Sequence, residues 1–148
     1  MASAAAKGKS YEELIVDILN QSGLEAWRTN KANIADPVQY KAGFDGGVDI
    51  CATFSHNGKS AYKEFLFYIQ CKNHKVPLEK TAVAEVYAGM HVRNAKADNC
   101  IPVVFSTSDT SEETRLYAKQ LGVELILPHE MSMIIQAKKT GKVPYDNY

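Results

Sequence analysis

The chain has 148 residues, of which 45% are hydrophobic and 23% are charged, and its formal net charge is zero. This composition is typical of one globular domain with its own core. A zero net charge does not indicate a nucleic-acid or membrane partner, so any electrostatic attraction must come from local clusters of charge. No apolar run approaches the roughly 20 residues of a membrane-spanning helix, and the start lacks the apolar core of a signal peptide. We therefore expect one soluble intracellular domain over residues 1–148, in the cytoplasm, nucleoid or an organelle, with flexible tails at 1–8 and 139–148.

The first 44 residues predict a helix, a strand and a loop. Apolar residues recur three and four positions apart before Gly23, which is a suitable helix terminator. Ser10 is a candidate N-cap, and Glu13 stands three residues later, as in a capping box. Residues 24–29 predict a short strand, and residues 30–44 predict a loop.

Two further strands follow. Apolar and polar or small residues alternate from Val48 to Ser55, which is the period of a half-buried strand. A turn is expected at residues 56–60. A second apolar face runs through a strand from about Tyr62 to Lys72.

The second half of the chain alternates helices with strands. The expected elements are a helix over 78–95, a strand over 100–106, a helix that Asp109 and Glu112 cap and Gly122 ends, a strand over 123–127 and a helix over 128–137. Three strands without intervening helices predict an antiparallel meander, and the later strands predict parallel crossovers. The fold class is therefore α/β, with a mixed central sheet flanked by helices.

Polar side chains lie where the two middle strands begin and end. Asp49 begins one strand, whereas Gln70 and Lys72 end the next. If the strands pair antiparallel with Asp49 opposite Gln70, these three side chains share one face. The opposite face then carries the apolar residues Val48, Ile50, Ala52, Phe67, Ile69 and Cys71.

The connection between these strands allows a second register. Asn57-Gly58 is a strong signal for a two-residue hairpin, which would pair Asp49 with Leu66. A longer loop centred near Lys59-Ser60 pairs Asp49 with Gln70 instead. We favour the longer loop because residues 55–64 are almost entirely polar.

Several segments resemble a known family. The segments are GFDGGVDI (43–50), YIQCKNH (68–74), VAEVYAGM (83–90) and PVVFSTSDTSEETRLYAKQLGVELI (102–126). They are similar to the catalytic domain of Mrr-type restriction endonucleases, within the PD-(D/E)xK nuclease superfamily, in its variant where glutamine replaces the second acid. The resemblance implies a restriction-endonuclease-like fold, with an αβββαβ core plus an added α-β-α, and a Mg²⁺-dependent DNA endonuclease activity.

The resemblance also implies roles for individual residues. Asp49, Gln70, Lys72 and Glu13 would be catalytic, and Mg²⁺ would be bound by Asp49, Gln70 and the backbone carbonyl of Cys71. Hard cations prefer oxygen ligands, and Mn²⁺ is expected to substitute. Because a carboxamide carries no charge, we expect weak metal affinity. Lys72 would orient the attacking water or neutralise the phosphate, Glu13 would be an outer-shell acid, and Asp45 would be a second-shell or alternative acid.

DNA is the expected partner. Contacts to its phosphates are expected from Arg28, Lys31, Lys59, Lys63, His74, Lys75 and Lys80. A homodimer is expected because duplex cleavage needs two active sites. No separate base-reading module is recognisable, so sequence recognition would come from a partner subunit, or the enzyme would read DNA structure or modification.

Other functions stay open at this stage. A Holliday-junction or other structure-specific resolvase of similar fold is one, although such enzymes usually carry Glu where this chain has Gln70. A catalytically inactive nuclease fold that binds DNA or assists assembly is another. The third is a structural α/β protein with no nucleic-acid role. The three cysteines, far apart in sequence, favour buried free thiols over disulfides or a zinc site.

Overall fold

The computed structural model describes residues 4–31, 33, 46–54, 65–94 and 99–140. The elements are α1 (Ala4–Gln21), β1 (Glu25–Arg28), β2 (Ile50–Phe54), β3 (Phe65–Lys72), α2 (Lys80–Arg93), β4 (Cys100–Ser106), α3 (Glu112–Leu121), β5 (Glu124–Ile126) and α4 (Pro128–Thr140). Their order is the predicted one. Within these described residues, no helix is long and apolar enough to cross a bilayer.

The strands form one mixed sheet in the order β1-β2-β3-β4-β5. β1, β2 and β3 pair antiparallel as a meander, whereas β4 and β5 join by parallel pairing. The predicted α/β fold class is therefore confirmed. In the centre of the sheet, β3 has an antiparallel neighbour on one side and a parallel neighbour on the other.

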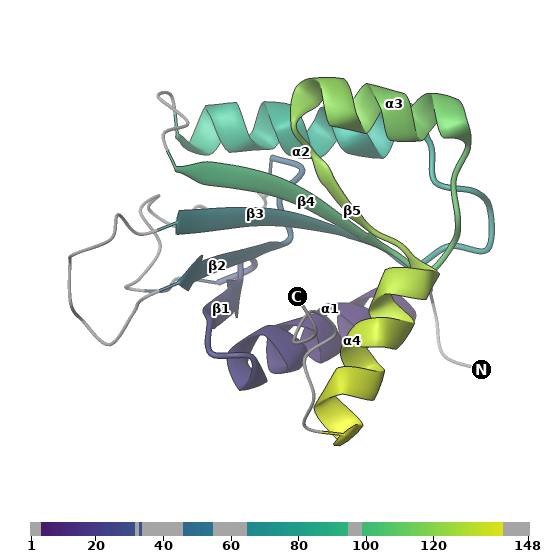
Figure 1. The fold of residues 1–148 in the computed structure, drawn as a ribbon. Helices are drawn as coiled ribbons and strands as arrows, with labels where there is room; N and C mark the ends of the chain where they lie inside the picture. The colour runs from purple at the N-terminus through teal and green to yellow at the C-terminus, as the bar shows by residue number, and fades with distance from the viewer. Residues whose placement is uncertain (1–3, 32, 34–45, 55–64, 95–98, 141–148) are drawn as a thin grey trace, which may run out of the picture.

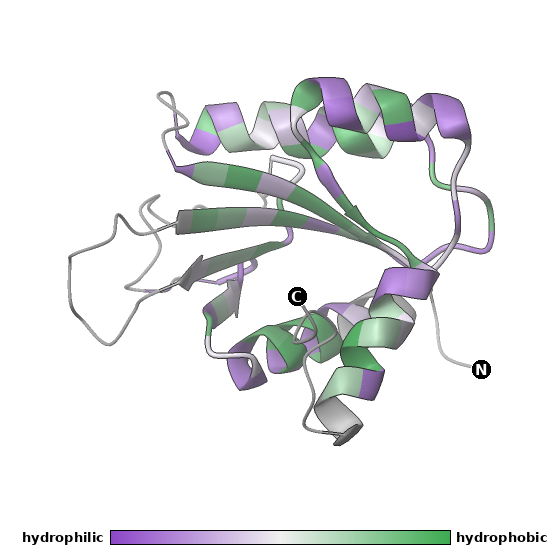
Figure 2. Cartoon of the chain, viewed as in Figure 1, coloured by the Kyte–Doolittle hydropathy of each residue, from purple (hydrophilic) through white to green (hydrophobic). Residues whose placement is uncertain are grey.

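Helices cover both faces of the sheet. α1 and α4 lie against one face, and α2 and α3 lie against the other (Figure 1). Hydrophobic residues, green in Figure 2, run along β2, β3 and β4 between these two helical layers. On the α1 side the core contains Ile15, Ile50, Ile69 and Phe105 among others.

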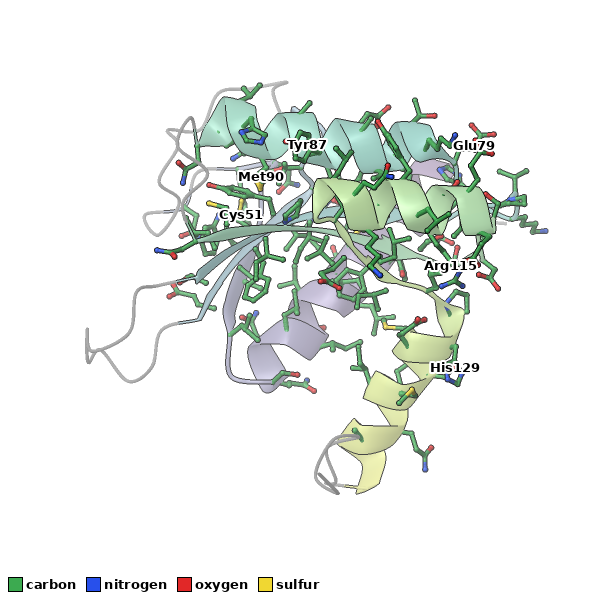
Figure 3. The ribbon with its side chains drawn as sticks, turned by 45° about the horizontal axis from the view of Figure 1, so that its top comes forward. Cys51, Glu79, Tyr87, Met90, Arg115 and His129 are labelled. Carbon is green, nitrogen blue, oxygen red and sulfur yellow. The ribbon has the colours of Figure 1, made fainter. Side chains whose placement is uncertain are left out.

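On the α2 side the core is divided between two clusters. One joins α2 to α3 and β4 through residues such as Val83, Val86 and Val104. The other joins Met90 of α2 to Cys51 and Tyr68, and Figure 3 shows Met90 and Tyr87 beside Cys51. All three cysteines are free thiols, as predicted, but only Cys51 is buried, whereas Cys71 and Cys100 are partly exposed.

Two predicted helix starts are wrong. α1 begins at Ala4, so Ser10 lies inside the helix and is not its N-cap. Ala4–Ala6 have the strongest intrinsic helix propensity, which explains the additional turns.

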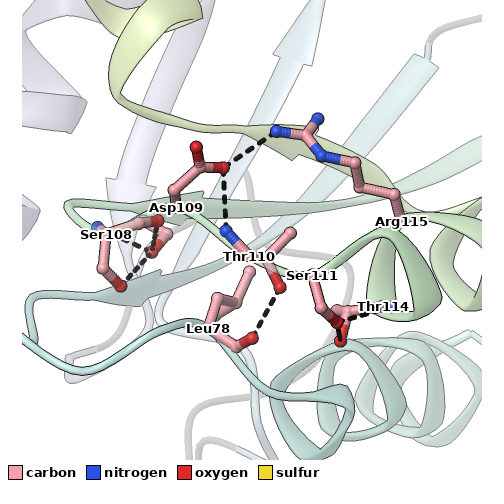
Figure 4. Close-up of polar contacts among 8 residues, drawn as sticks. Leu78, Ser108, Asp109, Thr110, Ser111, Thr114 and Arg115 are labelled. Carbon is pink, nitrogen blue, oxygen red and sulfur yellow. Dashed lines mark hydrogen bonds and ion pairs between the residues drawn. The ribbon is translucent and has the colours of Figure 1, made fainter.

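The N-cap of α3 is Ser111 and not Asp109. The Ser111 hydroxyl accepts a hydrogen bond from the Thr114 N–H at 3.2 Å. Asp109 instead accepts from the Thr110 N–H and pairs with Arg115, each at 2.8 Å (Figure 4). The helix ends at Gly122, which has a left-handed φ of 73°, as expected.

Candidate active site

The register of β2 and β3 is the predicted one. Ile50 pairs with Ile69 and Ala52 pairs with Phe67, so Asp49 lies at the end of β2 next to Gln70 and Cys71. Leu66 pairs with Thr53, which excludes the tight hairpin that would place Asp49 opposite Leu66. The Asn57-Gly58 segment itself lies outside the described residues.

The alternation along β2 changes at Asp49. The Asp49 N–H donates to the Ile69 carbonyl at 2.8 Å, although Ile69 is the residue paired with Ile50. Two residues therefore face one, as in a β-bulge. As a result Val48 is buried with Tyr68 and Met90 on the α2 side, and the prediction that Val48 shares the face of Ile50 is wrong.

The bulge directs the Asp49 carboxylate to the end of β3. Its Oδ2 accepts a hydrogen bond from the Cys71 N–H at 2.9 Å. The carboxylate thus takes the place of a backbone acceptor where the β2–β3 ladder ends. An acid is fixed beside the peptide that joins Gln70 to Cys71.

The turn before Asp49 packs directly on α2. Gly47 has a φ of +85°, and a Cβ there would lie 2.7 Å from the Glu85 carbonyl oxygen. A Cβ on Gly89 would lie 2.1 Å from the Gly46 carbonyl oxygen. Side chains at these positions would prevent such close approach. The glycines around Asp49 therefore allow the turn to lie against the helix backbone.

Gln70 is buried, with 4% of its surface exposed, and it is held by α2. Its Nε2 donates to Oε2 of Glu85 at 2.9 Å. Its Oε1 is also buried, and it has no hydrogen-bond partner among the described residues. A buried polar atom without a partner is costly in a folded protein and often marks a ligand position.

Lys72 lies on the same side of β3. Its Nζ is 3.8 Å from the same Glu85 oxygen. Lys72 and Glu85 line a cleft of about 200 Å³, together with residues that include His74, Pro77 and Ser108. Glu85 therefore contacts both Gln70 and Lys72, the two polar residues that end β3.

A second acidic group lies on the α1 side of β3. Arg28 of β1 is 3.6 Å from Glu12 and 3.9 Å from Glu13. Glu12 is the more buried acid, with 20% of its side chain exposed against 55% for Glu13. Burial raises the pKa of the Cys71 thiol, and the charges of Asp49 and Glu12 raise it further while Arg28 lowers it.

The structure thus identifies two acids that sequence reasoning missed. Glu12 is the more buried of the two α1 glutamates and its charge raises the pKa of the Cys71 thiol, whereas the role predicted for Glu13 stays a prediction. Only the placement of α1 against the sheet distinguishes these two glutamates. The signal for Glu85 was its presence in the VAEVYAGM segment at the centre of α2.

The other predicted contact residues lie in different settings. Lys31, His74 and Lys75 are exposed, and the Thr107 hydroxyl donates to the His74 carbonyl at 3.2 Å. Lys80 is paired with Glu113. The predictions for Asp45, Lys59 and Lys63 fall outside the described residues.

The acids at this edge of the sheet do not form a ready-made metal cage. In the described part of the chain, no group of three or more His, Cys, Asp or Glu side chains is arranged to hold a metal ion. The oxygen donors at this end of β3 are the Asp49 carboxylate, which contacts the Cys71 amide, the buried Gln70 amide oxygen and the backbone at Cys71. This donor set is oxygen-only, which suits a hard cation, but it carries a single charge.

Comparisons with known proteins agree with this architecture. Two solved structures share the fold: a protein of unknown function, AF1548, and MspJI restriction endonuclease in complex with a 27-mer oligonucleotide. The first has a TM-score of 0.56 and 19% identity over 86% of this chain and 65% of its own length. The second has a TM-score of 0.54 and 16% identity over 96% of this chain and 30% of its own length. This chain therefore spans less than two thirds of either protein.

Sequence comparison identifies the family of the chain. No curated protein matches the chain. The model of the Mrr_cat family, described as a restriction endonuclease, matches residues 3–135. That range contains every described strand and all the residues of the candidate site. The chain therefore belongs to the Mrr_cat restriction endonuclease family, a family of nucleases.

Proposed function

We propose that this chain is the catalytic domain of a Mg²⁺-dependent, Mrr-like DNA endonuclease. The observation that carries the proposal is the Asp49 carboxylate at 2.9 Å from the Cys71 amide. It lies beside a buried Gln70 and a half-buried Lys72 at the end of β3. Family membership supports phosphodiester hydrolysis as the reaction.

Asp49, Gln70 and the Cys71 backbone carbonyl are the proposed metal ligands. The unpartnered Oε1 of Gln70 supports this, because a cation would satisfy it. The Lys72 carbonyl accepts from Thr107 on the β4 side, so the alternation of the strand turns the Cys71 carbonyl toward β2 and Asp49. A bound Mg²⁺ or Mn²⁺ would supply charge for the phosphate and lower the pKa of a water.

Lys72 and an acid on α1 complete the proposed machinery. The ammonium group of Lys72 would orient the attacking water or neutralise the charge that grows on the phosphate. Glu12 would be the outer-shell acid, with Glu13 as the more exposed alternative. Arg28, which pairs with both glutamates, would then hold them and not contact DNA directly.

DNA is proposed to approach along the edge that carries Lys72. His74 and Lys75 follow β3 and Lys31 follows β1, and all three are exposed to meet phosphates. Lys80 would contact DNA only after leaving Glu113. Cleavage of both strands would need two copies of the site, so a homodimer is proposed, and sequence recognition would come from elsewhere than this domain.

A plasmid assay tests the proposal. Supercoiled DNA, methylated or unmethylated, and a four-way junction are incubated with protein and Mg²⁺ or Mn²⁺. Asp49→Ala and Lys72→Ala should each abolish nicking, whereas Glu124→Gln, an exposed change on β5, should not. Cleavage that survives both substitutions would refute the site. Binding without cleavage by the wild type would instead favour the inactive module, which the single charge of the donor set allows.

A further inference from the structure

Glu85 has a specific relation to Gln70 that the sequence motif does not contain. A glutamine amide has two ends of nearly equal size, and its hydrogen bonds decide which end faces which way. An ionised carboxylate only accepts hydrogen bonds. Glu85 therefore requires the NH₂ end of Gln70 to face it, at 2.9 Å, and turns Oε1 away from α2.

Burial makes this orientation hard to reverse. Gln70 is 4% exposed, so its amide has little access to water that could replace the Glu85 hydrogen bond, although the Glu85 side chain itself is 48% exposed. A flipped amide would direct its oxygen at the carboxylate, and two acceptors would face each other without a proton between them. Among the described residues, the Gln70 amide has no hydrogen bond other than the one to Glu85.

We infer that Glu85 is a positioning residue that presents the Gln70 oxygen to the metal. The inference rests on the proposed function for its metal, but the geometry that it invokes exists in the metal-free protein. In this arrangement the negative charge lies on the helix and the neutral amide lies on the strand. Gln70 supplies a neutral oxygen ligand, while Glu85 supplies the charge behind it and also holds Lys72 at 3.8 Å.

Gln70 and Glu85 should therefore act as a matched pair. Gln70→Glu alone would place two carboxylates in hydrogen-bond contact, and their repulsion would displace one of them. Glu85→Gln alone would leave two amides with no fixed orientation. The exchange Gln70→Glu with Glu85→Gln restores a carboxylate–amide hydrogen bond in reverse. It should recover much of the function that each single change loses.

The first test uses the protein without metal or DNA. In an ¹H–¹⁵N spectrum, the side-chain amide of Gln70 should show one strongly shifted, slowly exchanging proton, assigned by its loss in Gln70→Glu. Glu85→Gln and Glu85→Ala should return this signal to the position of an ordinary glutamine. Glu124→Gln is the control and should leave it unchanged. A Gln70 signal that Glu85→Ala does not move would overturn the inference.

The second test separates metal binding from turnover. Loss of a residue that orients a metal ligand typically costs about 10–100-fold in metal affinity or activity. Glu85→Gln should raise the Mg²⁺ concentration for half-maximal nicking by this factor and change the maximal rate less, while the exchange variant should return toward wild type. Thermal unfolding of each variant identifies any loss of folding. If the wild type does not cleave, Mn²⁺ titration by calorimetry on the same variants replaces the nicking assay, and equal affinities would again overturn the inference.

Discussion

Replacing Gly89 by alanine should have two opposite effects on stability, a gain in helix propensity and a steric clash. Gly89 lies inside α2, where alanine is the better helix former by about 1 kcal/mol. Propensity alone therefore predicts a more stable protein. However, the new Cβ would lie 2.1 Å from the Gly46 carbonyl oxygen and 2.9 Å from a methyl carbon of Val48.

The contact with Gly46 should dominate. An ordinary contact is 3.4 Å or more, so the turn would have to move away from α2 by about 1.3 Å. Overpacking of this kind costs about 1–3 kcal/mol. The cost falls in the upper part of that range, because a carbonyl oxygen cannot rotate aside as a side chain can. After the gain in propensity, we expect a net loss of about 1–2 kcal/mol, or roughly 2–8 °C in Tm for a chain of this size.

Urea unfolding combined with the plasmid assay measures both consequences. Gly89→Ala should lower the unfolding midpoint and also reduce nicking, because Asp49 follows the displaced turn by two residues. The matched control is Ala88→Gly, an exposed neighbour on the same helix. It should cost about 1 kcal/mol through propensity alone and leave nicking intact. A Gly89→Ala protein that is as stable and as active as the wild type would refute the close packing of the turn on α2.

Three further predictions test other parts of the structure. Ser111→Ala should lower stability by about 1 kcal/mol through loss of the α3 cap, whereas Asp109→Ala should cost less. Equal losses of stability in urea unfolding would contradict Ser111 as the N-cap. The Cys71 thiol stays protonated in the fold while it ionises near its ordinary value of 9.0 in the unfolded chain. Stability should thus be unaffected below about pH 9 and fall above it, and Cys71→Ala should flatten that decline in urea midpoints. Glu12→Gln should raise the Mg²⁺ requirement for nicking more than Glu13→Gln, and the reverse order would exclude Glu12 as the outer-shell acid.

The register of the central strands was predictable because it follows from local alternation. Pairing Ile50 with Ile69 buries one face of both strands, and a shift of one residue would expose that face to water. That constraint was sufficient to bring Asp49 next to the end of β3. The direction of Val48 was not predictable, because the bulge at Asp49 comes from the packing of the Gly46–Gly47 turn against α2.

The contacts between helices and strands could not be predicted from the sequence. Glu12 and Glu13 differ by one position on α1, and only the docking of that helix shows which acid is the more buried. Glu85 lies 15 positions after Gln70 in the sequence, and with 48% of its side chain exposed it resembles any solvated glutamate in the middle of a helix. The predicted N-cap of α3 was wrong for a simpler reason. Ser108, Asp109 and Ser111 are comparable N-cap candidates in the segment SDTS, and backbone geometry selects Ser111.

The position of α2 has a consequence for how the enzyme is inactivated. This helix supports the turn that precedes Asp49, and it also carries the carboxylate that contacts Gln70 and Lys72. Small domains open in cooperative pieces before they unfold as a whole. A partial opening that lifts α2 would separate the proposed catalytic groups while the meander and α1 remain folded. Heat should therefore abolish activity a few degrees before the main unfolding transition, and DNA bound across the site should protect the amides of α2 from hydrogen exchange.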